Sequence, residues 1–168
     1  MSIHSATPVR IELPFLPGEG AVNVYLFREP EPVLIDAGFN SPNAWQSLQT
    51  ALAEQKLAVT DLKRVIITHP HVDHYGLAAR IARESQAEVW MADVGVQWLH
   101  HFLELWQQRI TYYRELFLPG LGLPEAGQLF VGWMQQSLER WEPILAERIV
   151  SFRVTQPLAL GGLEWQPL

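Results

Sequence analysis

The sequence contains no cysteine among its 168 residues. Disulfide bonds, thiolate metal sites and cysteine nucleophiles are therefore excluded, and any metal ion must be held by histidine, aspartate or glutamate side chains. Because histidine is also scarce, with six residues in all, the positions of the histidines carry most of the information about a metal site.

Long apolar runs and positive charge are also in short supply. No apolar segment approaches the ~18 residues that span a bilayer, and residues 1–15 have neither the charged region nor the apolar core of a signal peptide. Twelve Lys and Arg residues against 18 Asp and Glu residues give a net charge of −6, and the basic residues are scattered singly. We therefore expect a cytoplasmic protein that binds neither a membrane nor nucleic acid.

The 48% hydrophobic content of a chain of this length predicts one compact globular domain. Segments rich in β-branched and aromatic residues alternate with amphipathic segments as far as residue 93. We expect a β-hairpin and then buried strands that alternate with helices, with strands over 9–15, 21–29, 32–38, 62–69 and 87–93 and helices after Ser41 and over 73–85. This order predicts an α/β (α+β) fold.

A helical insertion is predicted at about 94–149. Apolar residues recur at spacings of three and four over 94–118, as in a long amphipathic helix: Leu99, Phe102, Trp106, Ile110, Tyr113 and Phe117. The Pro- and Gly-rich segment 119–127 ends this helix, and a second Trp-rich helix follows. Two hypotheses stay open: the aromatic residues pack together as an ordinary hairpin core, or one face forms a wall that selects substrates with an apolar portion.

The histidines are concentrated in residues 68–76, which have the sequence THPHVDHYG and follow directly on a predicted buried strand. In extended backbone, residues two apart point to the same side, and a residue before proline is biased toward extended backbone. His69 and His71 can therefore direct two imidazoles at one point, while Asp73 and His74 lie where the chain turns into a helix and diverge from that direction. The segment thus supplies half of each of two neighbouring metal sites.

Other interpretations of these residue types are common. A single histidine near a strand end is usually a structural or surface residue, and an aspartate such as Asp73 is most often a helix N-cap. We interpret His4, His100 and His101 as structural or surface residues. Four ligand-type residues within six positions, between a buried strand and a helix, instead favour a metal site.

The segment THPHVDHYG resembles the H-x-H-x-D-H signature of the metallo-β-lactamase fold superfamily, and VLIDAGFN at 33–40 resembles that superfamily's strand ending in Asp and Gly. The order of the expected elements over about 10–93 agrees with it as well. The resemblance implies half of an αββα sandwich and a metal-dependent hydrolase similar to glyoxalase II-like members. The superfamily includes thioester hydrolases, lactamases, lactonases, phosphodiesterases, nucleases and a dioxygenase, so it does not choose the reaction.

Carried to this sequence, the resemblance implies that His69 and His71 bind a first metal ion and that Asp73 and His74 bind a second. Zinc is the expected cofactor, as one or two ions, with iron and manganese as the other candidates. Asp73 is also the candidate catalytic residue, because its carboxylate could orient the nucleophile.

Two residues next to this cluster are assigned supporting parts. Asp36 resembles the superfamily's support residue, which orients the ligands from beneath the site through hydrogen bonds. Capping of the turn at Gly38 is an equal alternative for Asp36. Thr68 is expected to bond nearby backbone and not to be a ligand.

The resemblance covers an amino-terminal half only. Members of the superfamily supply a third histidine, a bridging aspartate and a last histidine from later in the chain, but here no histidine follows His101 and no aspartate follows Asp93. We therefore expect residues 1–168 to form a single partial domain, truncated relative to the family. The inner face of its sheet and one sheet edge would be exposed, which favours a homo-oligomer or a complementing carboxyl-terminal half.

Two functions of different classes follow, and the sequence leaves open whether the chain alone is an enzyme. In the first, the chain belongs to a metal-dependent hydrolase in which hydroxide attacks an ester, thioester or related bond of a small-molecule substrate with an apolar portion. In the second, it is a catalytically incomplete truncated domain that self-associates and binds metal weakly or not at all.

Overall fold

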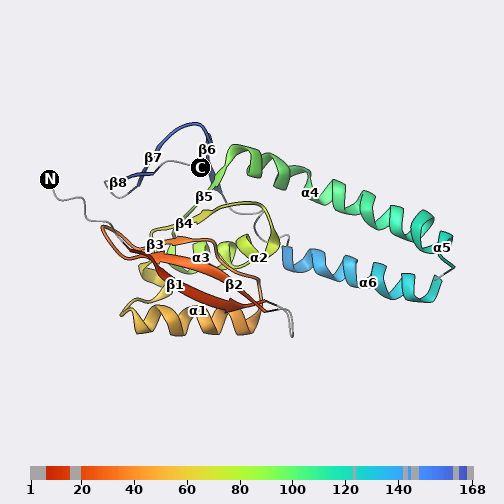
Figure 1. The fold of residues 1–168 in the computed structure, drawn as a ribbon, viewed down its shortest axis with the longest axis horizontal. Coiled ribbons are helices and arrows are strands. Elements are labelled where there is room, and N and C mark those ends of the chain that lie inside the picture. The colour runs from red at the N-terminus through yellow and green to blue at the C-terminus, as the bar shows by residue number, and fades with distance from the viewer. Residues whose placement is uncertain are drawn as a thin grey trace.

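The computed structural model describes residues 7–15, 20–122, 124–141, 144, 148–160 and 163–165. The centre is a six-stranded sheet with the strand order β1-β2-β3-β4-β5-β6, and β7 pairs with β8 in a separate two-stranded sheet (Figure 1). Strands β1 to β3 are antiparallel, and β3 to β6 are parallel. The mixed α/β fold predicted from the sequence is therefore confirmed.

The elements follow one another in the order that the sequence indicates. The strands are β1 (Val9–Pro14), β2 (Ala21–Phe27), β3 (Val33–Ile35), β4 (Arg64–Ile67), β5 (Glu88–Ala92), β6 (Ile149–Phe152), β7 (Leu158–Leu160) and β8 (Leu163–Trp165). The helices are α1 (Pro42–Glu54), the 3-10 turn η1 (Val59–Asp61), α2 (Val72–Tyr75), α3 (Ala78–Ser85), α4 (Asp93–Tyr112), the π-helical turn η2 (Tyr113–Phe117), α5 (Leu118–Gly120) and α6 (Pro124–Trp141).

Local sequence signals account for several boundaries. The hairpin β1–β2 pairs Val9 with Leu26 and Pro14 with Ala21. Helix α1 begins as predicted, because the Ser41 hydroxyl accepts a hydrogen bond from the Ala44 N–H at 3.1 Å and a proline occupies the first turn.

The predicted helix over 73–85 is wrong in one respect, since the structure divides it into α2 and α3. The division occurs at Gly76, which packs against the backbone that follows β3. A Cβ atom at Gly76 would lie 2.5 Å from the Asn40 nitrogen and 2.7 Å from the Gly38 oxygen. Only glycine permits this approach, and it holds α2 against the end of β3.

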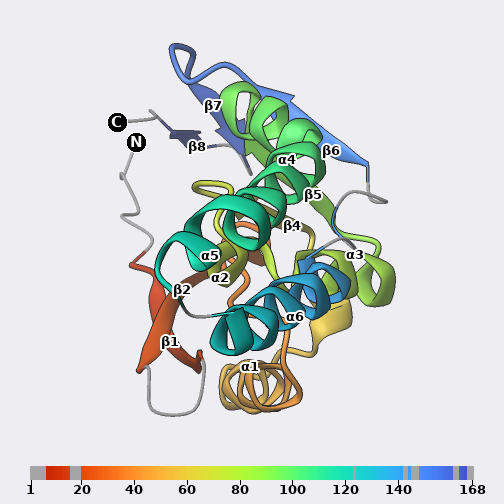
Figure 2. The same cartoon turned by 90° about the vertical axis from the view of Figure 1, so that its right-hand side faces the viewer.

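The main core lies between one face of the sheet and helices α1 and α3. Strand residues that alternate along β3, β4 and β5 point into it, and each is at most 1% exposed: Leu34, Val65, Ile67, Val89 and Met91. Trp45, Leu48 and Leu52 of α1 and Ile81 of α3 pack onto them. Figure 2 shows these two helices on one side of the sheet and the β7–β8 hairpin on the other.

The second face of the sheet has fewer buried apolar side chains than the first and is partly covered. Val33 and Ile66 are buried there beneath half-buried side chains, which are Phe27, Ile35, Trp90, Phe152 and Leu158. The expectation of a broadly exposed sheet face therefore holds only in part, because these large side chains pack on one another and Leu158 of β7 lies against them. Among the described residues, the exposed large apolar side chains are concentrated in the helices after β5.

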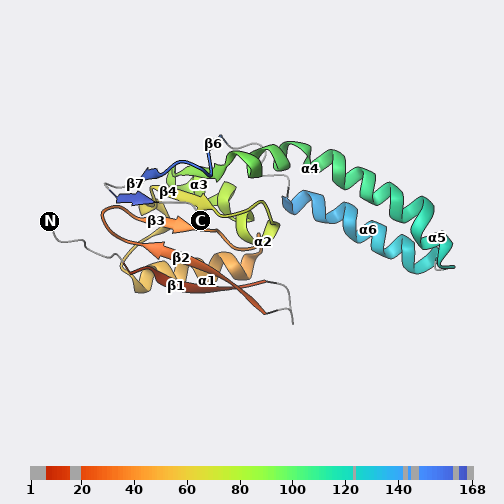
Figure 3. The same ribbon diagram turned by 45° about the horizontal axis from the view of Figure 1, so that its top comes forward.

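Between β5 and β6 the chain forms a helical hairpin, which projects beyond the sheet (Figures 1 and 3). Ile110 of α4 packs with Val131 and Met134 of α6 in a small core of its own. The Trp106 Nε1–H donates a hydrogen bond to the Met134 oxygen at 3.0 Å, which joins the two helices. Within the described part of the chain, none of the helices has the length and apolar character needed to cross a membrane.

Candidate metal centre

Asp36 lies directly after β3 and beneath the histidine segment. It is only 5% exposed, and its φ angle of 60° is uncommon for a residue other than glycine. The Asp36 N–H donates to the Ile66 oxygen at 2.8 Å, which ties the end of β3 to β4. A sparsely populated backbone conformation thus directs a buried carboxylate toward the segment 68–74.

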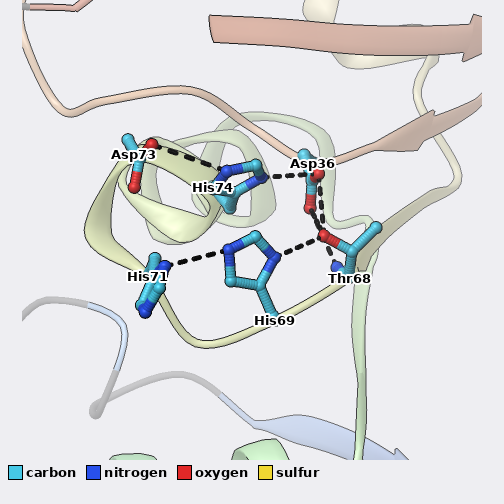
Figure 4. A network of polar contacts seen from close by, with 6 residues as sticks. All are labelled: Asp36, Thr68, His69, His71, Asp73 and His74. Atoms are coloured by element: carbon cyan, nitrogen blue, oxygen red, sulfur yellow. Dashed lines mark hydrogen bonds and ion pairs between the residues drawn. The ribbon is translucent and has the colours of Figure 1, made fainter.

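The Asp36 carboxylate is held by two residues far along the chain (Figure 4). The Thr68 N–H donates to Oδ1 at 2.8 Å, the Thr68 Oγ1 lies 3.0 and 2.9 Å from the two carboxylate oxygens, and His74 Nδ1 lies 2.7 Å from Oδ2. The carboxylate therefore supports the cluster, as the resemblance implied, and these contacts are not with the turn at Gly38. The expectation for Thr68 was wrong in part, because its hydroxyl contacts the Asp36 and His69 side chains.

This network defines which ring nitrogens carry protons. A hydroxyl has one proton, and Thr68 donates it to the Asp36 carboxylate, so Thr68 Oγ1 accepts from the His69 Nδ1–H at 2.9 Å. His74 donates its Nδ1–H to the same carboxylate. When neutral, both rings are then left with an unprotonated Nε2, the form of imidazole that can bind a metal ion.

His69 and His71 converge as the sequence predicts. His69 Nε2 lies 3.0 Å from His71 Nδ1, and the ring centroids are 4.6 Å apart. Two nitrogens bound to one tetrahedral zinc ion at about 2.05 Å would lie about 3.3 Å apart. The pair therefore fits one ion with only a small opening of the two rings.

Asp73 and His74 form a second pair beside the first. Asp73 Oδ2 lies 3.5 Å from His74 Nε2, close to the separation of about 3.3–3.5 Å expected for an oxygen and a nitrogen on one ion. The His69 and His74 ring centroids are 4.0 Å apart, so the two pairs are immediate neighbours. Figure 4 shows the first pair in the turn that follows β4 and the second pair on α2, directly beside it.

The surroundings shift the pKa values of His74 and His69 in opposite directions. The hydrogen bond that His74 donates to the Asp36 carboxylate raises the pKa of His74 above its ordinary value. Burial lowers the pKa of His69, and the neighbouring His74 and His71 rings lower it further. His69 is therefore neutral at pH 7 and can act as a ligand without first losing a proton.

Each pair offers two ligands. Within the residues that the structure describes, no group of three or more His, Asp or Glu side chains is arranged to hold one metal ion. His100 and His101 are exposed on α4, and His101 Nδ1 contacts the Gln97 oxygen of its own helix at 2.9 Å. His4 lies outside the described residues.

A cavity of about 490 Å³ opens beside the cluster. His71, Asp73 and Tyr75 line it together with residues of α4. The aromatic residues of α4 were singled out from the sequence, whereas Arg109, which also lines the cavity, was missed. The signal was present, because Arg109 continues the spacing of four and three set by Trp98, Phe102 and Leu105.

Comparison with known proteins gives three findings. Residues 17–157 match the sequence model of the metallo-beta-lactamase superfamily. The chain is 32% identical over 172 residues to the "Probable metallo-hydrolase YqjP" of Bacillus subtilis (strain 168), and the match covers all of this chain and 50% of that protein. Its fold is similar to that of the metallo-beta-lactamase family protein TTHA1429 from Thermus thermophilus, with a TM-score of 0.70, 23% identity and coverage of 94% of this chain and 49% of the other. The chain thus spans about half the length of each relative.

Proposed function

The chain belongs to the metallo-beta-lactamase superfamily, and from this premise we propose that it carries part of the metal centre of a metal-dependent hydrolase. The observation that carries the proposal is the 3.0 Å approach of His69 Nε2 to His71 Nδ1 above a buried carboxylate. The similarity to a probable metallo-hydrolase supports the same class of reaction.

We assign His69 and His71 to a first metal ion and Asp73 and His74 to a second. Zinc is the preferred ion, with iron and manganese as the other candidates, because imidazole and carboxylate ligands accept all three. Asp36 orients the His74 ring directly and the His69 ring through the Thr68 hydroxyl. These contacts keep the ligating nitrogens directed into the centre.

In the proposed reaction, a bound ion would lower the pKa of water and polarise the bond to be cleaved. The chain's own residues position the reactants. Asp73 lines the cavity with a side chain that is 30% exposed, so its free carboxylate oxygen can accept a hydrogen bond from the attacking water. The substrate is proposed to be a small molecule with an ester, thioester or related bond and an apolar portion.

Two ligands per ion are fewer than the three protein ligands that catalytic zinc sites use. We therefore propose that the remaining ligands come from outside the described residues, either from a complementing carboxyl-terminal half or from a second copy of the chain. The alternative function, a catalytically incomplete domain that self-associates, predicts weak metal binding and no turnover.

The experiment is a hydrolysis panel on the purified protein. Esters, thioesters and phosphodiesters are offered after chelator treatment and again after zinc, iron or manganese is restored. We expect metal-restored turnover of at least one ester or thioester, and loss of roughly 100-fold or more in kcat for Asp73→Ala. Turnover that is unchanged by chelation, or absent with all three metals, would contradict the proposal.

A further inference from the structure

The cavity beside the candidate metal centre has two chemically different ends. Asp73 and His71 lie at one end, where α4 begins against the histidine segment. That approach is close, since a Cβ atom at Gly95 of α4 would lie 3.6 Å from Cδ of Pro70. Arg109 lies farther along the same helix. A ligand that fills the cavity therefore reaches from the reacting groups to a cation.

The wall between these ends is aromatic. Trp98 and Phe102 have ring centroids 5.1 Å apart, and Phe102 and Trp106 are stacked with centroids 5.6 Å apart. Trp98 and Leu105 remain 39% and 47% exposed, so apolar surface faces the open cavity. An apolar ligand that covers this surface removes it from water, which favours binding.

Arg109 differs from several other arginines in its surroundings. Arg10, Arg64, Arg80 and Arg114 each form an ion pair with a glutamate. Among the residues that the structure describes, Arg109 has no carboxylate partner, and its guanidinium instead lies 5.8 Å from the centre of the Trp106 ring. In a chain with a net charge of −6, this cation is left unneutralised beside an apolar cavity.

We infer that Arg109 is a substrate-binding residue that selects an apolar molecule carrying an anionic group, a carboxylate or a phosphate, at the end remote from the scissile bond. The inference rests on the proposed function, because the scissile bond is placed at the candidate metal centre. The guanidinium offers paired N–H donors that match either anion, and the aromatic wall holds the apolar part.

The helix sets the length of the preferred substrate. Eleven residues separate Trp98 from Arg109 in α4, which corresponds to about 16 Å along the axis. Side chains of a helix tilt toward its N-terminus, so the guanidinium lies nearer the metal centre than its Cα does. We therefore place the anionic group roughly 10–15 Å from the bond that is cleaved.

The first test compares two substrates with the zinc-loaded, full-length protein. Both are aryl esters with the same ten-carbon acyl chain, which ends in a methyl group in one and in a carboxylate in the other. In Arg109→Gln, we expect KM for the carboxylate substrate to rise about tenfold with kcat unchanged, while KM for the methyl substrate changes less than about twofold. Arg109→Lys should restore part of the loss.

Arg114→Gln is the matched control, because Arg114 belongs to the same helical hairpin, is exposed and pairs with Glu115 outside this cavity. It should leave KM for both substrates unchanged. Equal changes for the two substrates in Arg109→Gln, or no change for either, would overturn the assignment of Arg109.

The second test separates this inference from the proposed reaction. Tryptophan fluorescence of the chelator-treated protein is titrated with decanoate, decyl phosphate and decanol. We expect the two anionic chains to bind about tenfold more tightly than decanol, and the difference to vanish in Arg109→Gln. If one anion alone shows the preference, it identifies the head group.

If no ester is hydrolysed but this preference holds, the reaction fails and the binding site stands. If esters are hydrolysed but decanol binds as tightly as the anionic chains, the assignment of Arg109 fails and the reaction stands.

Discussion

Replacement of Asp36 by asparagine tests whether a buried carboxylate organises the candidate metal centre. Asparagine at this position would keep the shape of the side chain and would tolerate the positive φ angle. Its amide has one oxygen in place of two, however, while the Thr68 N–H, the Thr68 hydroxyl and the His74 Nδ1–H all require an acceptor. At least one donor would then face an NH2 group in a site that is 5% exposed.

The expected cost follows from this mismatch. Loss of one hydrogen bond to a charged group, with a buried donor left unsatisfied, costs about 2–3 kcal/mol. Asp36→Ala removes every acceptor and should cost about 4 kcal/mol. For a chain of this size, Asp36→Asn corresponds to a fall of about 5–10 °C in melting temperature.

Urea denaturation of the chelator-treated protein, followed by far-UV circular dichroism, measures the free energy of unfolding. Asp73→Asn is the matched control, because that side chain is 30% exposed and its contact with His74 is 3.5 Å long. We expect the control to change stability by less than about 0.5 kcal/mol. A loss in Asp36→Asn as small as that of the control would refute the reasoning.

The stability of wild type and that of Asp36→Asn should also depend differently on pH. Asp36 raises the pKa of His74, and a group with a raised folded-state pKa stabilises the fold fully below its unfolded pKa, about 6.5 for histidine. That contribution is lost as pH rises through the folded-state pKa. The stability difference between wild type and Asp36→Asn should therefore be largest below about pH 6.5 and should narrow as pH rises above the folded-state pKa of His74.

Two further substitutions test the supports of the site, each by urea denaturation. Gly76→Ala places a Cβ 2.5 Å from the Asn40 nitrogen and should cost about 3 kcal/mol, whereas Gly132→Ala, with nothing within 4 Å in α6, should be neutral or stabilising by up to about 1 kcal/mol. Equal effects of the two would contradict the close approach at Gly76. Trp106→Phe removes the hydrogen bond to Met134 and should cost about 1 kcal/mol more than Trp98→Phe, and equal costs would count against the bond between α4 and α6.

The parts of the fold that local physics controls could be predicted from the sequence. Ser41 and Pro42 carry an N-cap and a first-turn proline, so the start of α1 was predictable to the residue. The approach of His69 to His71 was predicted from their two-residue spacing around Pro70. The backbone there is a bend instead of the extended chain assumed, and the His71 N–H donates to the His69 oxygen at 2.9 Å.

Contacts between segments that are far apart in the sequence were harder to predict. Asp36 lies 32 residues from Thr68 and 38 from His74, and its role as a support was implied only by the family resemblance. The division of the predicted helix at Gly76 depends on backbone after β3, which no local pattern of residues reveals. Arg109 was overlooked because a single cation on an amphipathic helix usually faces solvent.

The central claim is that the four clustered residues bind metal, and the metal content of the purified protein tests it most directly. Wild type, His69→Ala/His71→Ala and the control His100→Ala/His101→Ala are loaded with zinc, desalted and analysed for metals. The control removes two exposed histidines of α4 and leaves the cluster intact. We predict equal zinc in wild type and control and a loss of about half or more of the bound zinc in His69→Ala/His71→Ala, because that variant removes the first of the two proposed sites. Equal zinc in all three proteins would contradict the claim.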